Sequence, residues 1–123
     1  MTQNKIKKMN IAFKVVLKKE WYSFIKSGNK IAADGFGNDI TAGYIHLSTH
    51  EQLWCGSSKF ANVNKRNYSL LTIDLNQCDD VRWNLKLNKV LGMHELYPCL
   101  YSPLILDKNI IWWGNFIKYD FYN

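Results

Sequence analysis

The sequence contains little of what marks several large classes of protein. It has two prolines and three cysteines, and Cys55, Cys78 and Cys99 are odd in number and widely spaced. Such cysteines form neither a disulfide framework nor the paired ligands of a zinc site, so we expect them to be unpaired. No apolar run approaches the roughly 20 residues of a membrane-spanning helix, and Lys14 interrupts the apolar segment 11–17 that could otherwise serve as a signal-peptide core. We therefore expect a cytoplasmic protein with no metal centre and no membrane partner.

Acidic residues are scarce in the first quarter of the chain. Residues 1–30 contain eight of the 16 basic residues but only one of the ten acidic ones, Glu20, and they account for the whole formal net charge of +6. A basic segment of this kind can bind a polyanion such as nucleic acid. Its first lysines are too few and too scattered for a nucleic-acid arm, and a solvated tail and helix face explain the charge without one. We interpret residues 1–10 as a basic tail and 11–123 as a single domain.

Apolar residues, by contrast, make up 47% of the chain and aromatic residues 15%, which is the composition of a packed globular domain. The pattern of β-branched residues predicts strands over 11–17, 43–48, 68–75 and 81–85. Apolar spacing predicts an amphipathic helix over 18–27 and a second helix after the second strand. This order predicts an α+β fold with a split, bent, mainly antiparallel sheet and two early helices.

Two other segments are rich in glycine or in aromatic residues. The loop 33–43 lacks the spacing of a phosphate-binding loop, so we interpret its glycines as turn residues or as part of a mobile flap beside a ligand. Residues 111–121 alternate as one long strand, or as two short ones around Gly114 and Asn115. Their aromatic stripe suits a buried core, and alternatively a platform on which bases stack.

The most informative stretch is Gly-Tyr-Ile-His-Leu-Ser-Thr at residues 43–49. Side chains alternate along a strand, so His46 and Ser48 should share one face at its end, beside the start of a helix. An imidazole and a hydroxyl next to a helix N-terminus favour an anionic ligand. Two structural explanations compete with this hypothesis. His46 can be a buried residue satisfied by a hydrogen bond, and Ser48 can cap the helix in a capping box with Glu51.

Four segments, in their order and spacing, carry a family resemblance. The first two are residues 13–21 and the motif at 43–49. The third combines Leu-Leu-Thr-Ile-Asp at 70–74 with Val-Arg-Trp at 81–83. The fourth is Glu-Leu-Tyr-Pro-Cys-Leu-Tyr-Ser-Pro-Leu at 95–104. The motif is close to a Gly-Phe-Ile-His-Leu-Ser-Thr pattern. Together these segments resemble a bacterial family, the domain of unknown function 952 family.

The resemblance implies the fold of ADP-ribosyltransferases, whose split, bent sheet has a cleft that holds NAD, and RNA 2′-phosphotransferases belong to the same broad superfamily. NAD is thus the cofactor it suggests, and a small anionic or nucleotide ligand is the partner. It implies that Lys14 and His46 contact phosphate or ribose, that Ser48 adds a hydroxyl, and that Tyr101 stacks on a ring. Family membership does not supply an activity, because fold does not determine function.

Three positions depart from the family's pattern. Ala42 replaces an acidic residue before the first glycine of the motif, Cys99 replaces the His of Pro-His-Leu-Tyr, and Asn84 replaces the Glu of Arg-Trp-Glu. The change at Asn84 matters most, because ADP-ribosyl transfer uses a carboxylate to orient the ribose and to stabilise the positive charge that develops on it. An amide carries no charge. We therefore predict weak or absent catalysis, with Asn84 still part of the ligand site.

Three functional hypotheses follow. The first is a NAD- or nucleotide-dependent transferase, the second is a non-catalytic binding module that uses the same cleft, and the third is an RNA-associated protein. In a variant of the first, Cys99 is a nucleophile with His94 or His46 as its base, against the alternative that Cys99 is inert packing. A cavity that joins His46, Asn84 and Tyr101 would favour the first two hypotheses.

Overall fold

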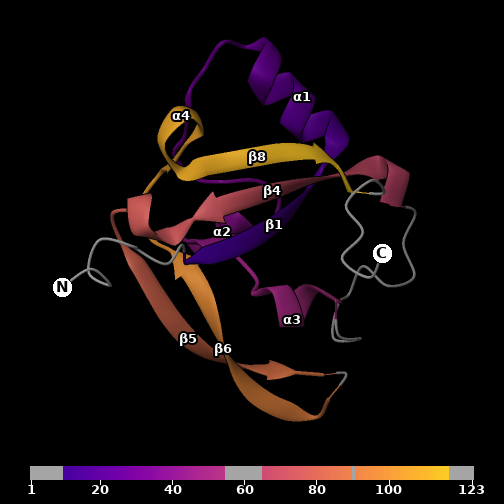
Figure 1. Cartoon of the computed structure of the whole chain (residues 1–123), viewed down its shortest axis with the longest axis vertical. Coiled ribbons are helices and arrows are strands. Elements are labelled where there is room, and N and C mark those ends of the chain that lie inside the picture. The colour runs from indigo at the N-terminus through magenta and orange to yellow at the C-terminus, as the bar shows by residue number, and fades with distance from the viewer. Residues whose placement is uncertain (1–9, 55–64, 90, 117–123) are drawn as a thin grey trace, which may run out of the picture.

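The computed structural model of the chain describes residues 10–54, 65–89 and 91–116, with the elements arranged as in Figure 1. In this part the strands are β1 (Ile11–Leu17), β2 (Ile31–Ala32), β3 (Ile45–His46), β4 (Tyr68–Asp74), β5 (Val81–Asn88), β6 (Met93–Leu100), β7 (Leu104–Ile105) and β8 (Ile110–Asn115). The α-helices are α1 (Lys18–Lys26), α2 (Asp39–Ala42), α3 (His50–Trp54) and α4 (Leu106–Asn109). Short 3₁₀ turns, η2 (Lys65–Asn67) and η3 (Leu75–Gln77), flank β4.

The strand pairs of the described ranges are all antiparallel. One sheet has the order β1-β4-β8, another has the order β3-β6-β5, and β2 pairs with β7. An isolated bridge between Phe13 of β1 and Ser48 connects the two larger sheets. The hairpin of β5 and β6 extends away from the first sheet (Figure 1). The fold is therefore α+β with mainly antiparallel sheets, as the sequence predicted.

Strand β1 lies where predicted and places core residues on both of its faces. Ala12 joins one buried cluster with Trp21 of α1, and Phe13 joins a second cluster with Leu70 of β4. Both faces of the first sheet are thus covered by apolar side chains. Lys14, in the middle of this strand, is nevertheless buried. A buried charge of this kind is tolerated only when it is paired and hydrogen-bonded.

Helix α1 confirms the predicted amphipathic helix. Trp21 is completely buried, and Phe24 and Ile25 pack against the same cluster. The helix ends at Lys26 with Ser27 as its C-cap, and Gly28 follows, with a φ of 76° and an amide that donates to the carbonyl of Ile25. A positive φ suits glycine and is the usual way to close a helix.

The region after residue 43 differs in detail from the prediction. Strand β3 covers only residues 45–46, and the cap of α3 lies one residue later than predicted. The amide of Thr49 donates to Gln52 Oε1 at 3.0 Å, and the amide of Gln52 donates to Thr49 Oγ1 at 3.2 Å. This is a reciprocal capping box, so the predicted box of Ser48 with Glu51 is wrong. The predicted continuation of this helix toward residue 63 lies outside the described residues.

Several elements were not predicted, among them β2, β7 and α4. The loop 33–43 contains the short helix α2, and residues 93–100 form β6, which pairs with all of β5. Strand β8 ends at Asn115, and the predicted strand beyond it lies outside the described residues. The ring of Trp113 in β8 packs edge-on against Trp21, with 5.4 Å between the ring centroids. Trp113 itself remains 37% exposed, so this part of the aromatic stripe lies against the core without being buried in it.

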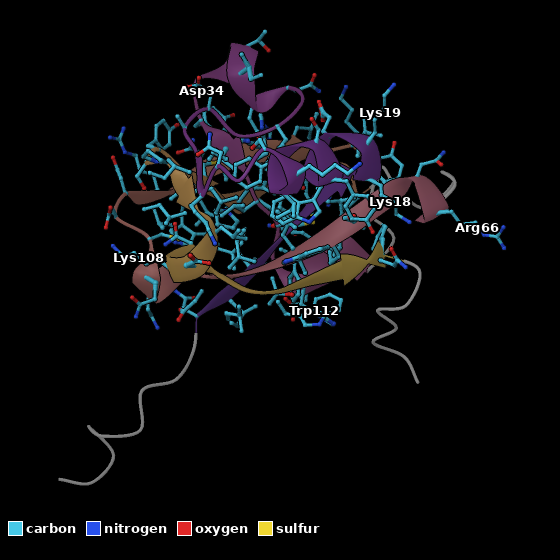
Figure 2. The ribbon with its side chains drawn as sticks, turned by 90° about the horizontal axis from the view of Figure 1, so that it is seen from above. Lys18, Lys19, Asp34, Arg66, Lys108 and Trp112 are labelled. Carbon is cyan, nitrogen blue, oxygen red and sulfur yellow. The ribbon has the colours of Figure 1, made fainter. Side chains whose placement is uncertain are left out.

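Cys78 and Cys99 are free thiols, while Cys55 and most of the basic tail lie outside the described residues. Charged side chains such as Lys19 and Lys108 project outward from the ribbon (Figure 2). Over the ranges that the structure describes, no helix is both long and apolar enough to cross a membrane.

Candidate functional site

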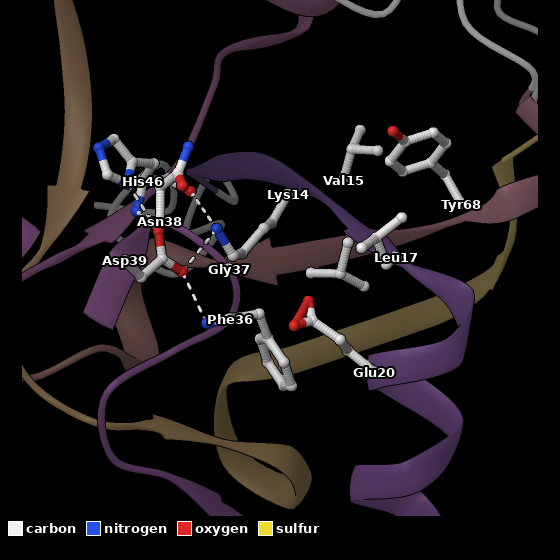
Figure 3. A pocket seen from close by; sticks show the side chains of 11 residues that line it. Lys14, Val15, Leu17, Glu20, Phe36, Gly37, Asn38, Asp39, His46 and Tyr68 are labelled. Atoms are coloured by element: carbon white, nitrogen blue, oxygen red, sulfur yellow. Dashed lines mark hydrogen bonds and ion pairs between the residues drawn. The ribbon is translucent and has the colours of Figure 1, made fainter. Parts of the chain in front are cut away.

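A buried carboxylate, Asp39 at the start of α2, organises the site, and it is only 2% exposed. Its Oδ1 accepts a hydrogen bond from the backbone amide of His46 at 3.0 Å and lies 2.6 Å from the ring Nδ1 of the same residue. Its Oδ2 accepts a hydrogen bond from the amide of Phe36 at 2.9 Å and pairs with Lys14 Nζ at 2.8 Å. Figure 3 shows these contacts converging on the carboxylate. Both oxygens are thus engaged by groups from three separate segments.

A glycine shapes the loop that seats this carboxylate. Gly35 has a φ of +77°, and a Cβ at this position would collide with the side chains of Asp39 and Ile45. Glycine alone adopts this backbone conformation easily and leaves the space free. The glycine-rich segment that we interpreted as turns therefore holds Asp39 against β3.

The pKa of Asp39 is about 2, below its usual value of 3.8. Burial alone would raise this pKa, but the hydrogen bond from the His46 ring, the charge of Lys14 and the backbone bond from His46 outweigh it. Lys14 Nζ also donates to the carbonyl oxygen of His46 at 3.0 Å. The buried charges are therefore balanced, and removal of either partner would leave the other unpaired at high cost.

His46 is the side chain through which this buried pair reaches solvent, because its side chain is 38% exposed. Its Nδ1 faces Asp39, so a neutral ring carries its proton on Nδ1 and presents the lone pair of Nε2. Within the described residues Nε2 has no hydrogen-bond partner. A neutral ring would accept a hydrogen bond from a ligand hydroxyl there, and a protonated ring would donate one to an anion. The structure thus orients His46 without burying it.

A pocket of about 380 Å³ opens beside these residues. Its walls come from β1, from α1, from the loop before α2 and from the start of β4. Figure 3 shows Lys14, Asp39 and His46 at one end of the pocket and Tyr68 at the other. Glu20 of α1 also lines it and forms no ion pair within the described part of the chain. The pocket therefore combines a fixed hydrogen-bonding end with an apolar wall and an uncompensated carboxylate.

A second group of side chains lies against the other side of His46. The ring of Tyr44 is 4.7 Å from the His46 ring, centroid to centroid, and stacks on Tyr101 at 5.1 Å. Lys86 Nζ lies 4.6 Å from the centre of the Tyr44 ring, and the guanidinium of Arg82 lies 4.2 Å from that of Tyr101. We call Tyr44, Tyr101, Lys86 and Arg82 the tyrosine stack.

The two cations of the tyrosine stack differ in their partners. Arg82 pairs with Asp80 at 2.9 Å, and both side chains are exposed. Lys86 forms no ion pair with any residue that the structure describes. Asn84 lies between them in β5, and its Nδ2 donates to the hydroxyl of Tyr101 at 2.7 Å. Positive charge is therefore available next to the ring of His46.

The structure brings four of the five predicted site residues into one neighbourhood. Lys14 and His46 meet at Asp39, while Asn84 and Tyr101 are hydrogen-bonded to each other. Lys14 and His46 line the larger pocket, Tyr101 lines a separate cavity of about 60 Å³, and Asn84 lines neither. Neither of these two cavities therefore joins His46, Asn84 and Tyr101. Asp39 lines both cavities.

Two predicted site residues have other contacts than we expected. Ser48 lines neither cavity, and its backbone pairs with Phe13 through hydrogen bonds of 2.8 and 2.9 Å. The chain leaves β3 before Ser48 and forms the isolated bridge with β1 there. The ring of Tyr101 is covered by Tyr44 and by Arg82. A ligand ring could stack on it only if Arg82 moved.

Cys99 does not have the surroundings of a nucleophile. Its side chain is completely buried, and this burial raises the pKa of its thiol, although Lys86 and Asn84 act in the opposite direction. The thiol is therefore protonated at neutral pH, whereas a nucleophilic cysteine needs the thiolate. Its place in β6 fits the alternative that Cys99 is a packing residue.

Asp39 is the site residue that sequence reasoning missed. The departure at Ala42 drew attention to a missing acidic residue near the motif, yet Ala42 is exposed and Asp39 supplies the carboxylate that holds His46. The sequence did contain one indication that Asp39 has a special role, because it is an acidic residue followed by an apolar one in a loop whose other residues favour turns. Its partner Lys14 is remote in sequence, and no local pattern connects the two.

The chain matches the family model described as Protein of unknown function (DUF952) over residues 15–111, and it belongs to this family. No curated protein matches it. Among solved structures it is similar to the X-ray crystal structure of protein CC0527 from Caulobacter crescentus, a structural genomics target. The TM-score is 0.65 and the sequences are 22% identical, over 86% of this chain and 85% of that chain. A double mutant of CC0527 matches equally well. At this identity the likeness shows the fold alone.

Proposed function

We propose that this chain binds a small nucleotide-type ligand, with NAD and ADP-ribose as the first candidates, at the His46 pocket and the adjoining tyrosine stack. The observation that carries the proposal is the His46 imidazole, which a buried carboxylate orients while its side chain stays 38% exposed beside the pocket. Side chains held in this way by a second layer of hydrogen bonds are typical of binding and catalytic sites. The pocket volume also lies in the range of roughly 300–1,000 Å³ that small-molecule sites occupy.

The charges suggest how such a ligand would lie. In the pocket Lys14 is neutralised by Asp39, and Glu20 adds a carboxylate, so this part suits an uncharged group rich in hydroxyls, such as ribose. Neutral His46 Nε2 and the Glu20 carboxylate are both hydrogen-bond acceptors for hydroxyls. Lys86 lies over the ring of Tyr44, which contacts the His46 ring, and its charge suits a phosphate, whereas Arg82 is already paired with Asp80. The ligand would therefore span His46, with its sugar in the pocket and its phosphate toward the tyrosine stack.

The same proposal includes an ADP-ribosyltransferase-like fold and a site with little or no transferase activity. The antiparallel sheets and the motif at 43–49 support the first part. Asn84 supports the second, because its amide donates to Tyr101 and supplies no negative charge. Of the two carboxylates in the pocket, Asp39 is already fully engaged by its four contacts. Of the hypotheses raised by the sequence, we therefore favour the binding module over the transferase.

A thermal-shift screen against NAD, ADP-ribose, mononucleotides and phosphorylated RNA tests the proposal. A ligand at 100 times its dissociation constant stabilises the native state by about 2.7 kcal/mol, which the screen detects. We expect NAD or ADP-ribose to raise the melting temperature, and NAD to release no nicotinamide on incubation. Stabilisation by RNA alone would favour the RNA-associated alternative, and rapid nicotinamide release would show that the site is catalytic.

His46→Ala then tests the assignment of the site. Loss of the hydrogen bond between His46 and a ligand hydroxyl should weaken binding of the identified ligand by roughly 0.5–1.5 kcal/mol, which is about two- to tenfold in affinity. The melting temperature should change little, because Asp39 keeps its bonds to Lys14 and to two backbone amides. His94→Ala, at an exposed histidine of β6, is the matched control and should bind normally. Unchanged affinity with a much less stable fold would make His46 a scaffold residue.

A further inference from the structure

Strand β5 has a free edge. It is the last strand of the sheet β3-β6-β5, and it contains neither a proline nor a shift in register. The amide of Tyr101 donates to the carbonyl of Asp80 at 2.8 Å, so Asp80 and every second residue after it direct their backbone groups at β6. The backbone N–H and C=O groups of Trp83, Leu85 and Leu87 therefore point away from the sheet. Nothing in the described part of the chain pairs with them.

The side chains of the same residues form an exposed apolar face. Leu85 is 64% exposed, and Trp83, Leu87 and the cross-strand neighbour Leu96 are exposed as well. Natural proteins protect free edges with charged residues, prolines or bulges, because an unprotected edge pairs with another chain. The cations of β5 lie on its opposite face, over the rings of the tyrosine stack. The apolar face of the hairpin is therefore left without such protection.

We propose that this edge pairs with a second copy of the chain, with two β5 strands antiparallel about a two-fold axis at Leu85. The proposal goes beyond the ligand site and does not depend on it. Such pairing would join two three-stranded sheets into one and give every outward N–H and C=O group of the central residues a partner. It would also bring the two apolar faces together, with Trp83 of each copy opposite Leu87 of the other.

The apolar residues and the charges of β5 together favour this register for pairing with a second copy of the chain. An axis at Asn84 would place Arg82 opposite Lys86 of the second copy, and an axis at Lys86 would place two lysines opposite each other. Like charges directly across a strand pair are destabilising. With the axis at Leu85, Lys86 faces Asn84 and Arg82 faces Asn88, so no cation faces a cation. An axis at Trp83 or at Leu87 would also keep the cations apart, but it would place Leu87 opposite Asp79 or Leu85 opposite Lys89. The strand is thus self-complementary in the register that also aligns its apolar residues.

Light scattering during size-exclusion chromatography tests the proposal. We expect the unmodified protein to have twice the 14.4 kDa mass of the chain. Leu85→Lys, which places two like charges at the axis, should reduce the mass to that of the monomer. Leu85→Pro should do the same, because proline removes the outward N–H and is tolerated on an edge strand. Ile111→Lys, at an exposed apolar residue of the other edge strand β8, is the matched control and should remain dimeric.

Cross-linking tests the register itself. Because Leu85 faces its own copy, Leu85→Cys should form a disulfide-linked dimer on oxidation, and Leu87→Cys, which faces Trp83, should form far less. A protein that is monomeric up to its solubility limit would overturn the proposal. Loss of the dimer in Ile111→Lys but not in Leu85→Lys would also overturn it, because the association would then use β8.

Discussion

Strands β4 and β5 carry similar aliphatic residues in different surroundings. β4 lies between β1 and β8, and its Leu70, Leu71 and Ile73 are completely buried. β5 lies at the edge of its sheet, and Leu85 and Leu87 are exposed by half or more. Leu96 of the central strand β6 lies on the same face as Leu85 and is 55% exposed as well. Whether other elements cover the face of a sheet, and not residue type, therefore decides whether a leucine is part of the core.

The charged residues of the two regions show the same contrast. Beside β4, the pair of Lys14 and Asp39 is buried, and its hydrogen bonds are all satisfied inside the protein. On β5, the pair of Arg82 and Asp80 is exposed to solvent. A buried pair is costly to break, whereas an exposed pair contributes little to stability. The region around β4 is thus held together by buried contacts, whereas the hairpin presents an apolar face and an exposed ion pair to solvent.

The largest effect should come from breaking the buried pair. Asp39→Asn leaves the Lys14 ammonium buried without a counter-charge, so the free energy of unfolding should fall by roughly 3–5 kcal/mol. Urea denaturation followed by circular dichroism measures the loss. Asp80→Asn, which breaks the exposed pair, is the control and should leave the urea midpoint nearly unchanged. Equal losses of unfolding free energy in Asp39→Asn and Asp80→Asn would show that the buried pair stabilises the fold no more than the exposed pair does.

The aliphatic residues give a somewhat smaller contrast. Leu71→Ala should lower the free energy of unfolding by about 2–5 kcal/mol, because it removes buried methyl groups and leaves a cavity. Leu85→Ala should change it by less than about 0.5 kcal/mol when both are measured on the monomer. A large loss from Leu85→Ala in a monomeric protein would mean that β5 takes part in the core.

The acid dependence of stability should show the smallest effect of the three. The pKa of Asp39 is about 2 in the folded protein and 3.8 when unperturbed, so folding favours the ionised form. The stability from this difference, about 2 kcal/mol, is fully present above pH 3.8 and is lost as the pH falls through 2. Urea midpoints measured between pH 6 and about pH 2 report this loss. In Asp39→Asn the loss of stability between pH 6 and about pH 2 should be smaller by the same amount. An unchanged loss in this variant would show that other carboxylates cause it.

Strands β1 and β4 and helix α1 were predictable because their patterns are local. Runs of β-branched residues or an amphipathic period identify such elements within a few residues. Strand β6 has no such pattern, since it contains His94, Glu95 and Pro98, and its formation depends on pairing with β5. Helix α2 has four residues in a glycine-rich loop, which is too short for any period to be visible.

The candidate site was predictable in its chemistry but not in its geometry. Lys14 stood out as the one charge in an apolar strand and His46 as a motif histidine, and the structure places both on one carboxylate. Asp39 was missed because its role depends on contacts between β1, the loop and β3 that no local spacing encodes. The position of Ser48 was missed for a similar reason, because its bridge to Phe13 is a long-range contact.

The bridge between Phe13 and Ser48 also provides a way to measure whether the pocket is occupied. The amides of both residues are hydrogen-bonded across the edge of β1. The N–H of Val15, two residues further along β1, points to the same edge. Val15 lines the pocket, and its N–H has no hydrogen-bond partner in the described chain. Amide hydrogen exchange should therefore be slow at Phe13 and Ser48 and fast at Val15 in the empty protein. A ligand that fills the pocket along this edge would slow exchange at Val15, so that its amide signal records occupancy.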